Sequence, residues 1–118
     1  MSTAKRKPVV RHYNDVEAVA CPCGQSTRII TGDDGAAMSA HVTHITHGAA
    51  HFHEIADEIY YIIEGEGHAE LDGETHQARP GTAIYIPAGV THRGWGDFKA
   101  LIVVNPAFDP DDEIVVGT

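Results

Sequence analysis

Short β-prone runs separated by glycine, proline and aspartate fill this chain from about residue 25 to its end. Runs of this length, bounded by turn-forming residues, are typical of all-β sandwiches and barrels rather than helical folds. Asp72-Gly73 lies between two alternating polar runs and predicts a two-residue hairpin turn, because glycine accepts the positive φ required there. Further turns are expected at 64–67, 80–81 and 87–89.

The expected strands cover residues 25–31, 40–46, 51–53, 58–63, 67–71, 74–78, 82–86, 92–95, 101–105 and 114–116. The segment 14–20 predicts either a short helix or an N-terminal strand. A chain of 118 residues is most economically one domain. We therefore expect a flexible tail over residues 1–8 and a single β-barrel domain over 9–118.

Charge and targeting signals exclude several classes of partner. Seventeen acidic side chains against eight basic ones give a formal net charge of −9, which disfavours binding to nucleic acid. Three of the basic residues lie within the first seven, but no apolar run follows them, so we expect neither a signal peptide nor a membrane partner. A cytoplasmic protein with reduced Cys21 and Cys23 is the resulting expectation, and the role of this Cys-Pro-Cys pair is left open.

Two histidines and a glutamate carry the strongest chemical signal of the chain. His51 and His53 are two residues apart on an expected strand, so their side chains share one face. Glu58 begins the next strand, and His92 follows the rigid turn at 87–89. Three imidazoles and one carboxylate form a ligand set suited to a divalent transition metal. The alternative is that these are ordinary polar strand residues, as a single His-x-His would usually be.

These residues stand in two spaced blocks that resemble the motifs of the cupin superfamily. The first block reads His51-x-His53, four residues, Glu58, six residues, Gly65. The second, after fifteen residues, reads Gly81, five residues, Pro87-x-Gly89, two residues, His92. Two positions depart from the family pattern, in which Ile45 would be glycine and Gly96 would be asparagine.

The resemblance implies a cupin-like double-stranded β-helix, or jelly-roll barrel, with His51, His53, Glu58 and His92 as the metal ligands. Such a donor set suits Mn, Fe, Co, Ni, Cu or Zn, and in an octahedral ion it leaves two positions open for other ligands. Because the bound ion is net positive, we expect a small, anionic, oxygen-rich ligand or substrate. The resemblance also implies a homodimer, for which Val9 and Val10 offer an N-terminal strand.

A metal-dependent enzyme of dioxygenase, isomerase or lyase type is the favoured function, with no catalytic residue assigned beyond the ligands. A non-catalytic metal-binding or ligand-sensing module is the alternative, and a metal-free structural barrel is disfavoured because all four ligand positions are intact.

Several other residues carry weaker expectations. Tyr60 shares strand parity with Glu58 and should point into the barrel. Arg28 is expected at the surface, with a substrate-carboxylate contact as the alternative. His47 is considered as an outer support of the metal ligands, and Trp95 as a lid or dimer contact. Residues 109–113 are expected to form a solvated acidic turn.

Overall fold

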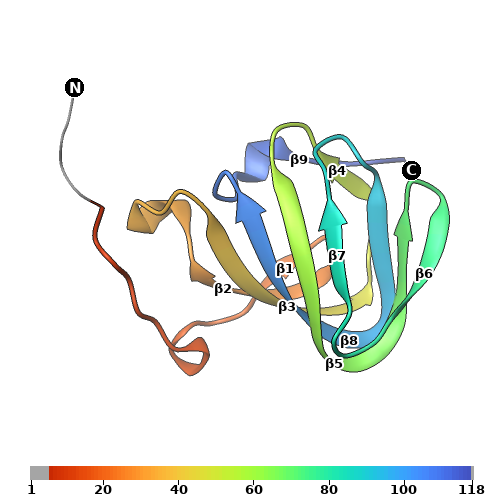
Figure 1. The fold of residues 1–118 in the computed structure, drawn as a ribbon, viewed down its shortest axis with the longest axis horizontal. Helices are drawn as coiled ribbons and strands as arrows, with labels where there is room; N and C mark the ends of the chain where they lie inside the picture. The colour runs from red at the N-terminus through yellow and green to blue at the C-terminus, as the bar shows by residue number, and fades with distance from the viewer. Residues whose placement is uncertain (1–5, 118) are drawn as a thin grey trace.

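A computed structural model describes residues 6–117, which form a curled antiparallel β structure (Figure 1). Residues 1–5 of the expected tail lie outside the described residues, as does Thr118. The strands are β1 (Val19–Cys21), β2 (Gly24–Ile30), β3 (Ser39–His47), β4 (His51–His53), β5 (Asp57–Leu71), β6 (Glu74–Ala78), β7 (Ala83–Ile86), β8 (His92–Asn105) and β9 (Glu113–Val115). Three 3₁₀ turns accompany them, namely η1 (Tyr13–Asp15), η2 (Gly32–Asp34) and η3 (Pro110–Asp112).

One path of hydrogen-bonded strands runs β1-β2-β3-β8-β4-β9, and β5 pairs with β8 on one edge and with β6 and β7 on the other. Every pairing is antiparallel. The sheet curls on itself, with β5 and β8 running its full height (Figure 1). The expected all-β jelly-roll barrel is therefore confirmed.

The turn expected at 64–67 is wrong, because β5 continues through it. The register between β5 and β8 shifts between Ile62 and Glu64, which bends the pair without ending the ladder. Gly65, at φ 84°, lies so close to the backbone of Asp97 on β8 that any β-carbon would collide with it. Glycine at this position therefore allows β5 and β8 to pack closely where they bend. It does not form a turn.

Burial alternates along β3, β4, β7 and most of β8, and the buried residues of the barrel fall into two groups. One group is apolar and forms the packed core, which includes Ile45, Ala56, Ile62, Ala69, Ala78, Ile84, Ile86, Phe98, Ala100, Ile102 and Val104. The other group is polar, and its buried members are Ser26, Thr27, Ser39, His41, Thr43, His51, His53, Glu58 and His92. Because water is excluded from both groups, the polar one requires partners inside the barrel.

The first described residues, 6–12, belong to no strand and lead away from the barrel (Figure 1). Arg11 holds this segment to the barrel through two hydrogen bonds to Asp34 and one to the carbonyl oxygen of Ile29. The alternatives for 14–20 are both partly realised, since η1 precedes β1. No helix within residues 6–117 is long and apolar enough to cross a membrane.

Candidate metal centre

Four side chains from three strands meet inside the barrel. His51 and His53 come from β4, Glu58 from β5 and His92 from β8, and each is buried. One potential ligand atom from each lies within 4.8 Å of those of the other three. Glu58 Oε1 is 3.2 Å from His53 Nε2 and 3.2 Å from His92 Nε2. The structure thus brings together the four residues singled out in the sequence, and the cluster could bind a metal ion.

Backbone carbonyl groups orient two of the imidazoles. His51 Nδ1 lies 2.9 Å from the carbonyl oxygen of Ala49, and His92 Nδ1 lies 2.9 Å from that of Val90. Because a carbonyl oxygen can only accept, Nδ1 carries the proton in both rings and Nε2 keeps its lone pair. Histidines that bind metals are commonly oriented in this way.

Several of the potential metal-ligand atoms have no hydrogen-bond partner within the described part of the chain. Glu58 Oε1, His92 Nε2 and both ring nitrogens of His53 form no hydrogen bond, because even the 3.2 Å contacts lack suitable alignment. A buried polar atom without a partner costs about 1–3 kcal/mol. A cation held by the four residues would satisfy these atoms together, and three nitrogens with one carboxylate oxygen fit a divalent transition metal.

The protonation states of Glu58 and His51 suit cation binding, whereas that of His53 is shifted toward the protonated form. Burial by itself would raise the pKa of Glu58, but the adjacent His53 and His92 lower it to about 2. Burial lowers the pKa of His51 to about 4, and the nearby His92 adds to this effect. For His53, burial opposes the charged form, yet contact with Glu58 prevails and raises the pKa. At neutral pH the cluster therefore contains an ionised carboxylate and a neutral His51, the forms in which these groups bind metals.

Asp112 stabilises the loop that carries two of the donors. Its carboxylate accepts hydrogen bonds from the backbone N–H groups of Glu54, Ile55 and Ala56 at 2.9, 2.9 and 3.0 Å. This loop joins His53 to Glu58. The expectation of a solvated acidic turn is therefore wrong for Asp112, which is only 8% exposed.

A second aspartate plays a similar part for the turn before His92. Asp57 accepts hydrogen bonds from the backbone N–H of Ala88 at 2.9 Å and from the Tyr85 hydroxyl at 2.8 Å. Neither aspartate carried a sequence signal, because the groups they bind are 28 to 58 residues away.

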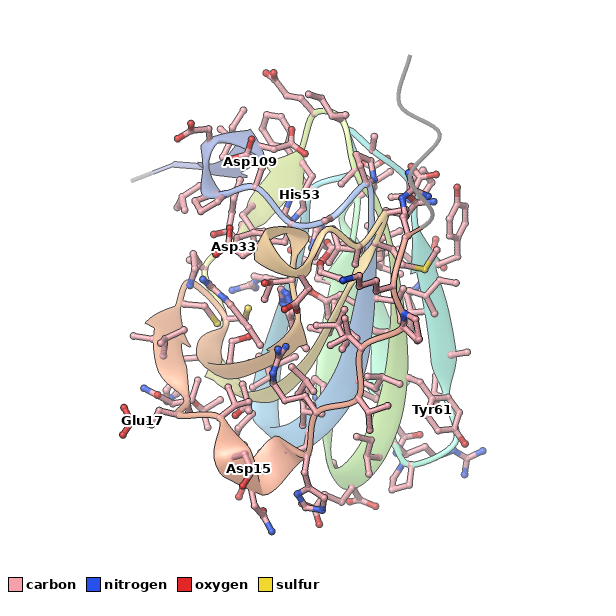
Figure 2. The ribbon with its side chains drawn as sticks, turned by 90° about the vertical axis from the view of Figure 1, so that its left-hand side faces the viewer. Asp15, Glu17, Asp33, His53, Tyr61 and Asp109 are labelled. Carbon is pink, nitrogen blue, oxygen red and sulfur yellow. The ribbon has the colours of Figure 1, made fainter. Side chains whose placement is uncertain are left out.

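A narrow inner cavity adjoins the donor cluster, the four potential metal ligands His51, His53, Glu58 and His92. It borders a wider outer cavity. The inner cavity has a volume of about 20 Å³, room for about one water molecule. The outer cavity, about 260 Å³, shares three lining residues with it, Arg28, His41 and Phe108. Figure 2 shows Asp33, which lines the outer cavity, at the same end of the barrel as His53.

The weaker sequence expectations have mixed outcomes. Tyr60 points inward as predicted, with its ring 6.0 Å from that of His92. Arg28 is half-buried and lines both cavities, so it is not a freely exposed surface side chain. His47 is exposed and lines neither the inner nor the outer cavity, so the predicted support of the metal ligands is not seen. Trp95 stacks on His68 at 5.5 Å and does not cover the cavity mouth.

Sequence reasoning missed three residues of the inner cavity. Glu113, in β9, places Oε2 3.9 Å from His51 Nε2, and burial raises the pKa of Glu113. Phe108 follows β8 and shares a wall with Arg28. His41, in β3, is buried beside the site, and no sequence signal singled it out.

Comparison with known proteins places these features in a family. Residues 38–104 match the sequence model described as the cupin domain. An uncharacterised protein of Methanocaldococcus jannaschii is 44% identical over 66 residues, covering 52% of this chain and 53% of that protein. An L-ectoine synthase of Nocardia farcinica is 38% identical over 94 residues, covering 75% of this chain and 72% of that enzyme.

A solved structure of a Planctomyces limnophilus protein has a TM-score of 0.86 and 36% identity, covering 92% of this chain and 96% of that one. The chain spans about half the length of the M. jannaschii relative that it matches.

Proposed function

The chain belongs to the cupin domain family, and from its buried donor set we propose that it is a metal-dependent enzyme acting on a small, anionic, oxygen-rich metabolite. The observation that carries this proposal is the cluster of unpaired inward atoms on Glu58, His53 and His92 beside a cavity that opens outward. A purely structural barrel gains nothing from burying such atoms, because apolar residues of similar size would be at least as stable there.

His51, His53, Glu58 and His92 are the proposed ligands of a divalent Mn, Fe, Co, Ni, Cu or Zn ion. When bound, such an ion supplies Lewis-acid chemistry and a template for an oxygen-rich substrate. The surrounding residues exclude water: Tyr60 and Phe108 cover the inner cavity with aromatic surface. Among the described residues, Glu113 is the one carboxylate besides Glu58 that lines the inner cavity. It is in position to accept or return a proton.

Among reaction classes, we retain dioxygen-dependent oxidation, isomerisation and lyase chemistry. The 38% identity with an L-ectoine synthase supports an enzyme over the alternative, a module that binds a metal or small ligand without turnover. Incubation with catechols, diketones, hydroxy acids and sugar phosphates, with and without oxygen, separates these classes. Oxygen uptake would indicate an oxidase or dioxygenase, whereas product formation without it would indicate an isomerase or lyase.

Metal analysis of protein purified without added metal tests the site itself. We expect about one transition-metal ion per chain in the wild type and its loss in His53→Ala. His47→Ala is the matched control, because His47 is an exposed histidine outside the cavities. Unchanged metal content in the His53 variant would contradict the proposal.

The remaining features of the proposal concern the whole protein. We propose one barrel domain over residues 9–118, a cytoplasmic location and a homodimer. Light scattering at micromolar concentration tests the dimer, and a purely monomeric mass would contradict it.

A further inference from the structure

Two cross-strand neighbours form an unusual polar pair on the barrel wall. Arg28 of β2 and His41 of β3 are register partners, and both line the inner and the outer cavity. His41 is only 6% exposed, and its Nε2 forms no hydrogen bond. Arg28 Nε is also buried without a partner. Two neighbouring residues that line the same cavities therefore each hold a buried nitrogen without a hydrogen-bond partner among residues 6–117.

The guanidinium of Arg28 also lacks a counter-ion. Within residues 6–117 no carboxylate lies within ion-pair distance of it, although Glu58 and Glu113 line the same inner cavity and Asp33 lines the outer one. Burial lowers the pKa of His41 to about 4, and the charge of Arg28 adds to this effect, so the imidazole is neutral at pH 7. A permanent cation half-buried beside a neutral donor is the arrangement that favours a bound anion.

Phe108 relates this pair to the proposed metal centre. The centre of its ring lies 4.8 Å from Arg28 Cζ and 5.5 Å from the centre of the His41 ring. The centre of the His53 ring lies 6.1 Å away. One aromatic ring therefore neighbours both the Arg28–His41 pair and a member of the proposed metal centre.

We propose that Arg28 and His41 form an anion subsite that holds a carboxylate at the far end of the substrate, while the near end faces the cluster of His51, His53, Glu58 and His92. This inference rests on the proposed function and specifies its substrate class as a small acid with a second oxygen-donor group. One guanidinium fork matches the two oxygens of a carboxylate. The outer cavity, about 260 Å³, is at the lower limit for small-molecule sites, which favours a compact metabolite.

Pairs of probes that differ only in the distal carboxylate test this subsite. 2-Oxoglutarate is compared with 2-oxopentanoate, and 2-oxoadipate with 2-oxohexanoate. Each is titrated anaerobically into Co²⁺-loaded protein by calorimetry, and the cobalt absorption spectrum reports ligand exchange at the metal. We expect at least one dicarboxylate to bind about ten- to a hundredfold more tightly than its monocarboxylate partner.

In Arg28→Met that preference should disappear, while the affinity for the monocarboxylate stays the same. Arg93→Met is the matched control and should keep the preference, since Arg93 is exposed, stacks over Trp95 and lines neither the inner nor the outer cavity. His41→Leu, which removes the imidazole donor and keeps the charge of Arg28, should reduce the preference in part. This variant carries the test if the Arg28 variant fails to fold by circular dichroism.

Equal affinities within both probe pairs for the wild type, or a full preference in the Arg28 and His41 variants, would overturn the subsite. Failure of the proposed metal centre is a separate result, since it is seen as absence of the cobalt spectrum before any acid is added. In that case succinate binding to the metal-free protein decides the matter. Loss of that binding in Arg28→Met supports the subsite, and unchanged or absent binding overturns it.

Discussion

Replacement of Asp112 by asparagine should destabilise the protein far more than its position in an acidic turn suggests. The carboxylate accepts three backbone hydrogen bonds, from Glu54, Ile55 and Ala56. An asparagine oxygen can retain the two bonds that reach Oδ1, but its NH₂ group would then face the buried N–H of Ala56. One buried donor is left unpaired and two charge-assisted bonds become neutral.

The expected loss follows from these contacts. An unpaired buried donor costs about 1–3 kcal/mol, and a bond to a charged group exceeds a neutral one by roughly 1 kcal/mol. We therefore expect Asp112→Asn to lower the free energy of unfolding by about 3–5 kcal/mol, a large part of the stability of a small domain. The affinity for a transition metal should fall as well, because the loop joins two of the proposed ligands, His53 and Glu58.

Urea unfolding of the metal-free protein at pH 7 measures the first effect, and competition with a metal chelator measures the second. Asp111→Asn is the matched control, since Asp111 is exposed and its side chain accepts no hydrogen bond within residues 6–117. If the Asp112 variant unfolded within about 0.5 kcal/mol of the wild type, the role of this carboxylate in holding the loop would be refuted.

Three further predictions concern titratable groups. Burial lowers the pKa of both His41 and His51 to about 4, so the unfolded chain binds protons more readily between pH 6.5 and 4. As the pH is lowered from 6.5 to 4, the free energy of unfolding of the metal-free protein should therefore fall by up to about 3 kcal/mol per histidine. In urea titrations, His41→Asn should remove roughly half of this decrease. Glu113→Gln should keep the bound metal, measured by elemental analysis, but reduce turnover by about 100-fold, and unchanged turnover would exclude a proton-transfer role. The hydrogen bond from Cys23 lowers the pKa of Cys21 to about 7, so its alkylation by iodoacetamide should reach half its maximal rate near neutral pH. Peptide mass spectrometry would count against this if the midpoint lay above pH 8.5.

The donor cluster could be predicted because its signal is local. His51 and His53 share a face by strand geometry alone, and the following turn returns the chain so that Glu58 starts the next strand. The second block acts in the same way, with the turn at 87–89 presenting His92. The convergence of the two blocks on one site was implied by the family resemblance, because local spacing alone does not bring His92 beside His51.

Two errors show where local reasoning ends. Glycines at 64–67 were interpreted as a turn, although glycine serves equally for a turn and for a close approach between strands. In the structure Gly65 serves the close approach, because it packs against the backbone of Asp97. Asp112 was interpreted as solvated, because aspartates beside proline usually lie in exposed turns.

Residue order and spacing alone determined an all-β chain with an inward histidine pair, a carboxylate and a third imidazole. Only the tertiary structure decided which polar residues surround them. Arg28 faces the cavity because of its register with His41, and Asp112 reaches a loop 56 residues away. Such placements depend on how distant strands pair and curl, and the free energy of those pairings is shared by the whole barrel rather than encoded in any short segment.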